Sequence, residues 1–467
     1  MRICLCLHKT IRARPRTRAV SRSVMLGVGA EAKLYGLKKG ICMKPIGVVI
    51  CNYNKRDFVL ECVQSVLESR EQNFDIFVVD NASTDGSVEA LNNTYKEEIT
   101  ILANSENLGG SGGFNTGLRV VRDRGYEYFM CLDDDALVDE NAISVLYEYM
   151  ESHPKVGMAG CRVYHRQLPE YIQQSGLMID FEHCTAKTIG ADQLEDGTLP
   201  DVIECDTVAT CAVMVRGSVI RDTEAGIMPE DNFIYWDDME WGHRIRLAGY
   251  KAVTLADAKA LHQMGANVKR PNTFINYYMW RNRTNFFMRY TPEEQMEQMS
   301  VQILGAFFDA MYESMFREEH NIMQTLAYAY QDAVSGTRGK AKDYQILKND
   351  ANDDKLIAYI QNKKSYCILE EGQEEDAMYL RNFFEKYNSS MREAPQQEAE
   401  VVFRLCPYIF QQRSISQEEI LIDGERNCII TEEDREAVDN YQYSKWLYIY
   451  MNQGTFLAAA KELRQKK

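Results

Sequence analysis

Two hydrophobic periods alternate along residues 46–255, and together they predict a sheet covered by helices on both faces. Short apolar runs rich in β-branched residues are each followed by a segment in which apolar residues recur at helical spacing. The expected strands are residues 46–51, 74–80, 99–103, 126–132, 156–164, 207–215 and 251–255. The expected helices lie near residues 58–67, 85–93, 114–124 and 140–150, and one begins near Trp236. The predicted fold class is therefore α/β.

The pattern changes after residue 292. Residues 293–335 are helical by composition, and smaller helical and strand-like runs alternate from about residue 345. The expected parts are a basic extension at 1–42, an α/β domain at 43–292, a helical segment at 293–344, and a small α/β and helical domain at 345–467. We expect the extension to be disordered or to precede the native start, for which Met43 is the candidate. No chemistry is visible in the last domain.

Charge and cysteine content narrow the class of function. Lys and Arg number 53 against 69 Asp and Glu, so the formal net charge is −16. Nucleic acid is therefore not an expected partner, because phosphate contacts need clustered basic side chains. The 13 cysteines lack metal-ligand spacing, which is typical of reduced thiols in a cytoplasmic protein. The sequence has no run of about 18 apolar residues, so any membrane contact is expected to be peripheral.

The expected strand at residues 126–132 leads directly into Asp133, Asp134 and Asp135. This is the carboxyl end of a strand, where open α/β sheets bind ligands. Like charges this close oppose ionisation, and a divalent cation relieves that cost. On a strand-like exit Asp133 and Asp135 project to one side and Asp134 to the other, so the outer pair could share an ion. The alternative is a solvated acidic turn before the next helix. A calcium loop is excluded, since its sixth position would be Val138 instead of glycine.

Acidic side chains recur among large aromatic residues at positions 233–241. Asp237 and Asp238 are candidates for a general base, because an apolar wall raises the pKa of a carboxyl group. On a helix, Asp237 shares a face with Trp241, and Asp238 falls on a neighbouring one. The alternative is that these acids only favour the helix N-terminus, with Trp236 and Trp241 in the core.

Two further features extend the candidate site. His262 follows the strand expected at 251–255, and its imidazole could join the carboxylates as a metal ligand or serve only in packing. The glycine-rich stretch 109–113 is predicted to be a loop that lets the backbone approach a ligand. Its spacing is not GxGxxG after a first strand, and a Walker lysine is missing, so neither nicotinamide nor P-loop chemistry is supported.

These motifs, in this order, resemble the family 2 glycosyltransferases with the GT-A fold, particularly the bacterial galactofuranosyltransferases and rhamnosyltransferases. The stretches that carry the resemblance are 48–54 (VVICNYN), 79–86 (VDNASTDG), 107–115 (NLGGSGGFN), 133–135 (DDD), 236–240 (WDDME) and His262. The similarity covers about residues 45–290, with the segment 336–340 at its farthest reach. It implies a Rossmann-like mixed sheet with helices on both faces, followed here by helices and a small C-terminal α/β unit.

The resemblance also implies roles in donor binding. Asp80 would hold the nucleotide base or its ribose, and Asp133, Asp135 and His262 would bind Mn²⁺ or Mg²⁺, which stabilises the departing diphosphate. The residues implied in nucleotide-sugar binding are Asn52, Asn54, Asp80, Gly110, Gly113, Asn115, Asp133 and Asp134.

An inverting transfer is implied in the same way. Asp238, with Asp237 as the second candidate, would take the proton of the acceptor hydroxyl as that oxygen attacks the anomeric carbon opposite the leaving diphosphate. Trp236, Glu240 and Trp241 would line the acceptor site. The donor would be a UDP- or dTDP-sugar, with galactofuranose or rhamnose favoured. The acceptor would be a cell-surface glycan or a lipid-linked oligosaccharide precursor.

The expected location is the cytoplasm, with the inner face of the membrane as a candidate contact through the aromatic and basic run 277–287. A helix packed beneath the sheet would show the same run. Three other functions compete: a non-catalytic sugar- or partner-binding protein on the same fold, a two-carboxylate glycosidase, and a sugar-phosphate nucleotidylyltransferase. The last would need a glycine-rich basic loop after the first strand, where this chain has Cys51-Asn52-Tyr53-Asn54. The sequence does not predict the oligomeric state.

Overall fold

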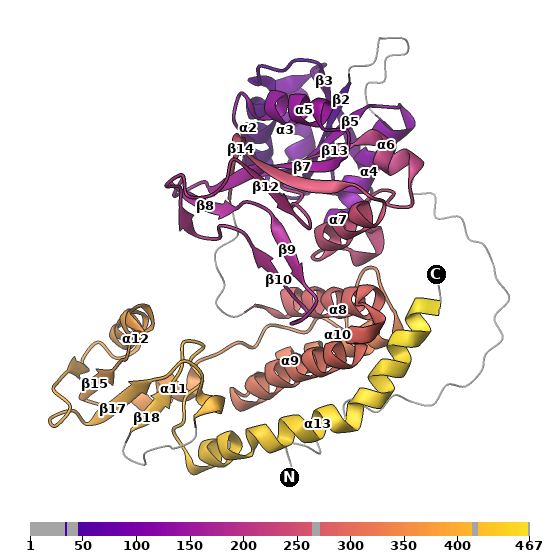
Figure 1. Ribbon diagram of the computed structural model, residues 1–467. Coiled ribbons are helices and arrows are strands. Elements are labelled where there is room, and N and C mark those ends of the chain that lie inside the picture. Colours follow the sequence, from indigo (N-terminus) through magenta and orange to yellow (C-terminus); the bar gives the residue numbers. More distant parts are fainter. Residues whose placement is uncertain (1–32, 35–44, 264–270, 413–418, 466–467) are drawn as a thin grey trace. The chain divides into compact units, whose positions relative to one another are not determined.

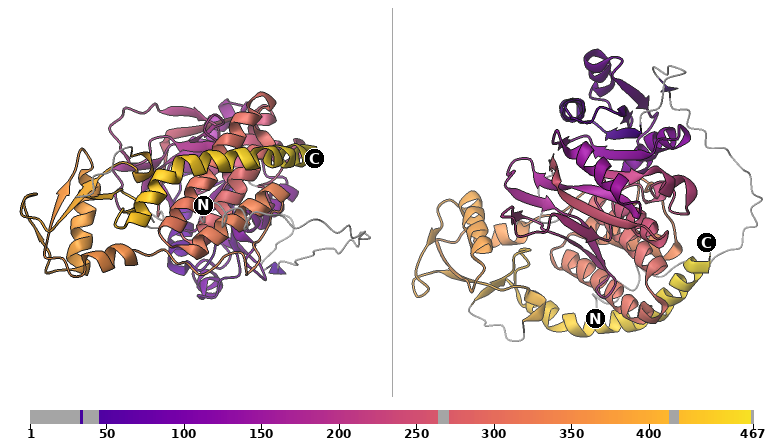
Figure 2. Two further views of the ribbon diagram at one scale, coloured as in Figure 1. Left: turned by 90° about the horizontal axis from the view of Figure 1, so that it is seen from below. Right: turned by 45° about the horizontal axis from the view of Figure 1, so that its top comes forward.

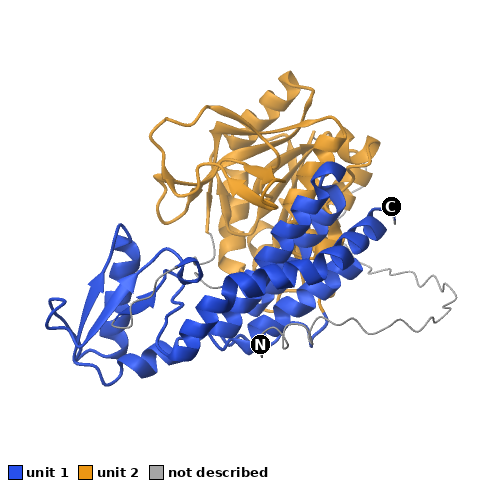
Figure 3. Ribbon diagram, turned by 60° about the horizontal axis from the view of Figure 1, so that its bottom comes forward, with its two compact units in different colours: residues 1–15, 268–336, 342–467 blue, residues 16–267, 337–341 orange. Residues whose placement is uncertain are grey.

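The computed structural model describes residues 33–34, 45–263, 271–412 and 419–465. The extension expected at 1–42 therefore lies outside the described residues, except for 33–34. The chain forms two compact units, shown separately in Figure 3. The described part of unit 2 is residues up to 263 together with Thr337–Ala341, and that of unit 1 is residues 271–336 and those from 342 onward. The four-part division expected from the sequence stays a prediction.

Unit 2 is built on a mixed sheet of twelve strands among the described residues (Figure 1). Along its main path the order is β1-β4-β3-β2-β5-β13-β7-β14-β12, while β6 pairs with β14 and β8 pairs with β7 and β11. A separate ribbon joins β9 and β10. The strands are β1 (Lys33–Leu34), β2 (Ile46–Asn52), β3 (Phe74–Asp80), β4 (Ile99–Ala103), β5 (Tyr128–Asp133), β6 (Ala136–Val138), β7 (Val156–His165), β8 (Tyr171–Gln174), β9 (Leu177–Asp180), β10 (Thr185–Thr188), β11 (Gln193–Leu194), β12 (Val202–Cys205), β13 (Ala212–Arg216) and β14 (Lys251–His262).

The direction of the strands brings their ends to one edge of this sheet. Strands β4, β3, β2 and β5 are parallel, β13 runs antiparallel to both β5 and β7, and β14 is parallel to β7. The carboxyl ends of β2, β3, β5, β7 and β14 therefore share an edge. In register, Asn52 lies opposite Asp80, and His262 lies opposite His165.

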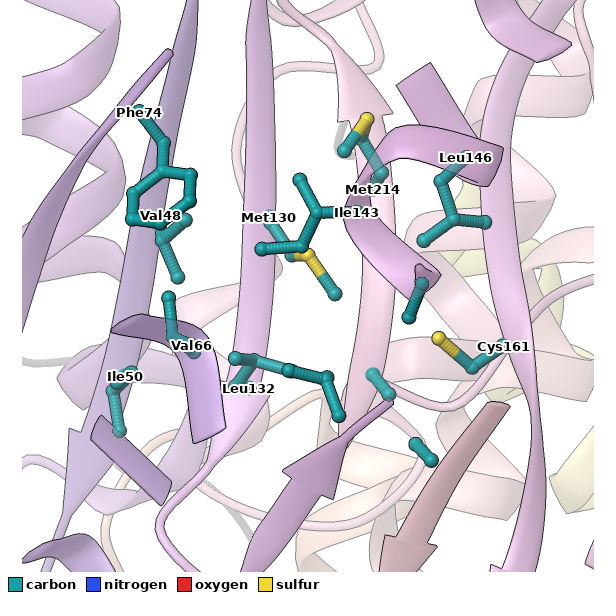
Figure 4. Close-up of a cluster of buried hydrophobic side chains, with 14 of the residues drawn as sticks. Val48, Ile50, Val66, Phe74, Met130, Leu132, Ile143, Leu146, Cys161 and Met214 are labelled. Carbon is teal, nitrogen blue, oxygen red and sulfur yellow. The ribbon is translucent and has the colours of Figure 1, made fainter. Parts of the chain in front are cut away.

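Helices cover both faces because successive strand side chains point to opposite sides. Val48 and Ile50 of β2 belong to a core packed under α2, α3 and α5, part of which Figure 4 shows, whereas Val49 belongs to a second core under α4, α6 and α7. Burial of each such side chain is worth about 1.5–3 kcal/mol. The helices are α2 (Arg56–Leu67), α3 (Ser87–Tyr95), α4 (Gly109–Asp123), α5 (Ala142–Ser152), α6 (Gly217–Asp222) and α7 (Asp237–Leu247), with a 3₁₀ turn η1 (Glu230–Asn232).

Unit 1 combines long helices with a small parallel sheet in the order β16-β15-β17-β18. The last helix, α13, packs on α9 and also touches α8 and α10, and it can be followed along them in Figure 2. The elements are α8 (Thr273–Tyr290), η2 (Glu293–Gln295), α9 (Met296–Phe316), α10 (His320–Ser335), α11 (Asp354–Ile360), β15 (Ser365–Leu369), α12 (Glu374–Tyr387), β16 (Arg392–Glu393), β17 (Val401–Leu405), η3 (Ile409–Gln411), β18 (Ile420–Ile422) and α13 (Glu432–Gln465).

The predicted α/β class is confirmed, with three corrections to its elements. The stretch 109–113 is not a loop but the first turn of α4, because Gly113 and Gly117 let that helix lie against the sheet: a Cβ at either position would collide with Cys51 or Val49. The strand expected at 251–255 continues to His262, and the one expected at 207–215 begins only at Ala212.

Two observations bear on the expected environment. The cysteines of the described part of the chain are unpaired, and most are buried. None of the described helices combines the length and apolar content that crossing a bilayer requires.

Candidate active site

Polar side chains at the ends of β2 and β3 hold the two loops that follow these strands. Asn52 is fully buried, and its Nδ2 donates to Asp80 Oδ1 at 2.9 Å and to Ser83 Oγ at 3.1 Å. Asp80 Oδ2 accepts from the Ser83 backbone N–H at 3.0 Å. Asn54 closes the network, since its Oδ1 accepts from Thr84 N–H at 2.7 Å. The predicted nucleotide residues Asn52, Asn54 and Asp80 therefore lie together at the edge where the strands end.

The structure brings the three predicted metal ligands together. One ligand atom each from Asp133, Asp135 and His262 lies within 4.8 Å of the others, and within the described residues this is the single group of such a kind. His262 Nε2 is 3.1 Å from Asp135 Oδ1 and 3.6 Å from Asp133 Oδ2. The strand β14 carries His262 to this point, opposite Ala136 of β6.

The donor set fits a divalent cation. Gln173 Oε1 lies 2.7 Å from His262 Nδ1, which places a proton on Nδ1 and leaves Nε2 free to ligate. Asp135 Oδ1 is buried and has no well-aligned hydrogen-bond donor among the described residues. Burial lowers the pKa of His262, but the carboxylates of Asp133 and Asp135 outweigh it and raise that pKa to about 9, so an ion would displace a proton from Nε2 when it binds. Two carboxylates and an imidazole suit Mn²⁺ or Mg²⁺.

Lys55 is a site residue that sequence reasoning missed. Its Nζ lies 2.6 Å from Asp135 Oδ2 and 3.1 Å from Asp134 Oδ1. Asp134 is not part of the ligand triad, and its Oδ2 accepts from Tyr53 N–H at 3.0 Å. Burial raises the pKa of Asp134 to about 6 even though Lys55 opposes that shift. The available signal was a lysine just before the first turn of α2, where the helix dipole disfavours a cation.

Asp237 and Asp238 begin helix α7, and their environments differ. Asp237 Oδ2 accepts from Ser111 Oγ at 2.7 Å, which ties it to the first turn of α4. Asp238 Oδ1 accepts from the Met239 N–H at 2.7 Å. Desolvation raises the pKa of both groups, and with the charges of Asp237 and Asp133 it brings the pKa of Asp238 to about 7. Asp238 therefore has the proton affinity of a general base near neutral pH.

The backbone before α7 is held in an unusual conformation. Phe233, Tyr235 and Trp236 have φ values of 70°, 64° and 61°, in the left-handed region. Such residues cost about 1–3 kcal/mol each and concentrate at functional sites. The Phe233 carbonyl also occupies the space of a Cβ at Gly109, whose own φ is +77°. The first turn of α4 and the entry to α7 are therefore fitted to each other.

Glu240 and the two tryptophans of α7 are placed against protein groups. Glu240 is 5% exposed and forms an ion pair with Arg338, whose Nη2 is 2.5 Å from Glu240 Oε2. Asn232 donates to the same oxygen. Trp241 is fully buried, with its Nε1 donating to a backbone carbonyl at 2.9 Å, and Trp236 is 7% exposed. These positions favour the core-packing alternative for both tryptophans.

The remaining predicted donor residues lie along α4. Gly110 faces Asp237, since a Cβ there would lie 4.0 Å from its Oδ2, whereas Gly113 packs on Cys51. Asn115 is fully buried, and its Nδ2 donates to the Met228 carbonyl at 2.8 Å. Direct contact of Asn115 with a donor stays a prediction, as do the other nucleotide assignments.

A cavity of about 340 Å³ adjoins the ligand triad at His262. It is lined by His165, Arg166, Leu168, Tyr171, Asp192 and Gln263, among others. His165 Nε2 lies 2.7 Å from Asp192 Oδ1, so part of its polar wall is already paired. Of the triad, His262 thus lines this cavity.

Part of the chain that carries this geometry is similar to a known protein family. Residues 47–216 match the family model described as Glycosyl transferase family 2. This part of the chain is therefore similar to the family 2 glycosyltransferases that the sequence motifs resemble, while the galactofuranosyl- and rhamnosyltransferase branch is not resolved by this match.

Curated relatives agree with that class. Glycosyltransferase GlyG of Streptococcus pneumoniae serotype 4 is 33% identical over 108 residues, which is 23% of this chain and 35% of the relative. Poly(ribitol-phosphate) beta-glucosyltransferase of Bacillus spizizenii is 27% identical over 365 residues, covering 70% of this chain and 55% of the relative. The chain thus matches between about a third and about half of the length of these relatives.

Solved structures to which the chain is similar include GalNAc-T7 with UDP, GalNAc and Mn²⁺, at a TM-score of 0.45, 11% identity, and coverage of 56% of this chain and 51% of that one. Residues 1–349 of S. aureus TarS give a TM-score of 0.36 in complex with UDP-GlcNAc, at 14% identity, and coverage of 62% and 91%.

Proposed function

We propose that this protein is a metal-dependent, inverting glycosyltransferase that uses a nucleotide-diphosphate sugar. The observation that carries the proposal is the cluster of Asp133, Asp135 and His262 at the sheet edge where the strands end. The charge of Asp133 also contributes to the raised pKa of Asp238. A family 2 domain over residues 47–216 supports the same class of chemistry.

In the proposed mechanism, different residues bind the metal ion, position a ligand and accept the proton during a single displacement at the anomeric carbon. Asp133, Asp135 and His262 would hold Mn²⁺ or Mg²⁺, which supplies positive charge to the leaving diphosphate when bound. Lys55 fixes Asp135 so that its Oδ1 faces His262. Asp238 accepts the proton of the acceptor hydroxyl while that oxygen attacks the anomeric carbon, and configuration inverts because only one displacement occurs.

The choice of Asp238 over Asp237 rests on their hydrogen bonds. Asp237 is engaged by the Ser111 hydroxyl, which uses one of its oxygens to join α4 to α7. Asp238 keeps more of its accepting capacity and has a pKa of about 7, so it can exchange a proton near neutral pH. We therefore assign the base to Asp238 and a positioning role to Asp237.

The donor and acceptor are proposed by class. UDP- and dTDP-sugars are the candidate donors, with galactofuranose and rhamnose favoured by the sequence resemblance. The names of two sets of relatives, a poly(ribitol-phosphate) beta-glucosyltransferase and the poly-beta-1,6-N-acetyl-D-glucosamine synthases, add UDP-glucose and UDP-GlcNAc to the panel. The acceptor is proposed to be a hydroxyl of a cell-surface polymer or its lipid-linked precursor.

The proposal is tested first by nucleotide binding. UDP or dTDP should raise the melting temperature of the protein only when Mn²⁺ or Mg²⁺ is present, because the diphosphate binds through the ion. Asp135→Asn should abolish this shift, whereas Asp238→Asn should keep it. A panel of nucleotide sugars then identifies the donor by release of nucleoside diphosphate. A protein that cleaves glycosides without nucleotide or metal would contradict the proposal and favour the glycosidase alternative.

A further inference from the structure

The outward face of helix α13 carries a row of exposed apolar side chains. On its inner side, residues such as Tyr441, Tyr448 and Phe456 are buried within unit 1. The row on the outer side, called here the α13 stripe, consists of Tyr443 (70% exposed), Trp446 (63%), Tyr450 (83%) and Met451 (50%). A solvated helix face normally carries charged residues. Between Asn440 and Ala460 the one charged residue is Lys445, which pairs with Asp309 of α9.

Gly454 lies on the same face and has no packing reason within its own chain. Glycine weakens a helix interior relative to alanine. A Cβ built at Gly454 meets nothing within 4 Å, unlike one at Gly113, which would collide with Cys51. The space beside Gly454, next to exposed aromatic rings in a 34-residue helix, is therefore open to a side chain from outside this chain.

The residues of this face are complementary to themselves when the helix is reversed. About the midpoint between residues 448 and 449, Tyr443 mirrors Gly454, and Leu447 mirrors Tyr450. Farther out, Glu436 mirrors Lys461, and both side chains are exposed. In an antiparallel pair with two-fold symmetry, each residue of one copy faces its mirror residue of the other.

We propose that α13 pairs antiparallel with α13 of a second copy of this chain, so that the protein forms a two-fold symmetric dimer. The Tyr443 ring of one copy covers Gly454 of the other, Leu447 packs on Tyr450, and Trp446 and Met451 flank the seam. Glu436 and Lys461 form ion pairs at both ends of the seam.

The stripe fits a second copy better than a lipid surface. Peripheral helices that bind anionic membranes carry Lys and Arg beside their apolar face, whereas this stretch has one lysine, already paired, in a chain with a net charge of −16. With about 150–250 Å² available per aromatic side chain, the exposed part of the stripe amounts to roughly 1,000 Å² over two copies. That area lies at the lower end of specific interfaces, so a reversible dimer is expected.

Sedimentation velocity of the full chain over a wide concentration range tests the proposal without substrate. The natural protein should shift from monomer to dimer as concentration rises. Tyr443→Glu/Tyr450→Glu should weaken dimerisation at least tenfold, because both changes place charge in the seam. The matched control is Met378→Glu on α12, where the side chain is 59% exposed, and it should dimerise like the natural protein.

Two further variants separate the seam from a folding defect. Gly454→Leu should keep or raise the melting temperature, because its own chain leaves the space open and leucine favours a helix, yet it should weaken the dimer at least tenfold. Glu436→Lys and Lys461→Glu should each weaken the dimer at low salt, and the two together should restore it, since the mirrored pairs become complementary again.

The contrary outcomes are also defined. A natural protein that stays monomeric at every concentration overturns the proposal, as does a Gly454→Leu variant that dimerises normally. Failure of the double charge reversal to restore association rules out the antiparallel register. Flotation of the monomer with phosphatidylglycerol vesicles, lost in Tyr443→Glu/Tyr450→Glu, would assign the stripe to a membrane surface instead. None of these readouts depends on glycosyl transfer.

Discussion

Both units contain parallel strands, but the edges where those strands end differ in what their carboxylates already bind. In unit 2, Asp135 Oδ1 is buried without a well-aligned donor and faces His262. In unit 1, Asp423 follows β18, and its two oxygens accept from the backbone N–H groups of Ile409, Glu425 and Asn427 and from the Asn427 side chain. Burial raises the pKa of Asp423 to about 6, as it does for Asp134. A raised pKa alone therefore does not mark a site; what distinguishes Asp135 is a buried oxygen without a well-aligned donor that faces His262.

The largest expected effect is a loss of transfer activity when a carboxylate of the candidate site in unit 2 is changed, but not when Asp423 of unit 1 is changed. Asp238→Asn should lower kcat by about 10²–10⁴-fold, because the general base is lost, while metal-dependent nucleotide binding persists. Asp423→Asn should leave kcat within about twofold, provided that the variant is folded. Transfer rates of both variants at saturating donor measure the difference. Near-normal turnover of Asp238→Asn would remove this residue from the role of base.

The next effect concerns stability and compares one ion pair from each unit. Arg338→Met leaves the buried carboxylate of Glu240 without its cation and should cost about 3–5 kcal/mol in the free energy of unfolding. Arg426→Met in unit 1 should cost less, since the side chain of its partner Asp353 is 18% exposed compared with 6% for the side chain of Glu240. Denaturant unfolding measures both. The double variant Arg338→Met/Glu240→Gln should recover part of the loss, and equal losses for the two single variants would contradict the difference in burial.

A smaller effect distinguishes a lysine at the ligand triad from one in unit 1. Lys55→Met removes the contact that orients Asp135 and should weaken Mn²⁺ activation about 10–100-fold. Lys355→Met breaks a pair with Asp434 in unit 1 and should leave the metal dependence unchanged. Activity titrated with Mn²⁺ gives both apparent affinities. Parallel weakening in the two variants would indicate a general loss of structure.

The smallest effect is the pH dependence of transfer. The folded-state pKa of Asp238 is raised to about 7, so its reactive carboxylate is lost as pH falls through that value. We expect kcat to fall about tenfold per unit below this pKa and to level off above it. Stability should change in the opposite direction. Because the fold favours the protonated form of Asp238, its contribution to the free energy of unfolding should be lost as pH rises from about 4 to about 7. The range from about pH 5 to about pH 8 spans this pKa. A flat kcat profile over that range, measured with saturating metal, would contradict the assignment.

The strands and their terminal acids were predictable because each is marked by local sequence. An apolar run that stops at Asp80 or at Asp133 needs no distant partner to be recognised, and the structure has β3 and β5 ending at these residues. The prediction of a loop at residues 109–113 was wrong because glycine is common both in loops and where a helix lies close to a sheet. Here it permits close helix–sheet packing at Gly113, and only the position of Cys51 on a neighbouring strand reveals which.

The residues that were missed depend on contacts between distant parts of the chain. Lys55 meets Asp135 across 80 positions, and Arg338 meets Glu240 across 98. The sequence around Lys55 or Arg338 does not indicate which acidic residue each one contacts. Trp241 illustrates the opposite error. An aromatic residue close to acids suggested a residue of the acceptor site, but Trp241 is fully buried, and the packing that buries it is not visible in the sequence.

The return of Thr337–Ala341 to unit 2 has a consequence for synthesis of the protein. Arg338 leaves the ribosome 98 residues after Glu240, once α8, α9 and α10 have already been made. At about 5–20 residues per second, α7 waits on the order of 5–20 s for this cation. The helix that carries Asp238 therefore reaches its final electrostatic environment late in translation, and a nascent chain halted before residue 338 would present the strands of the site with the base-bearing helix not yet secured.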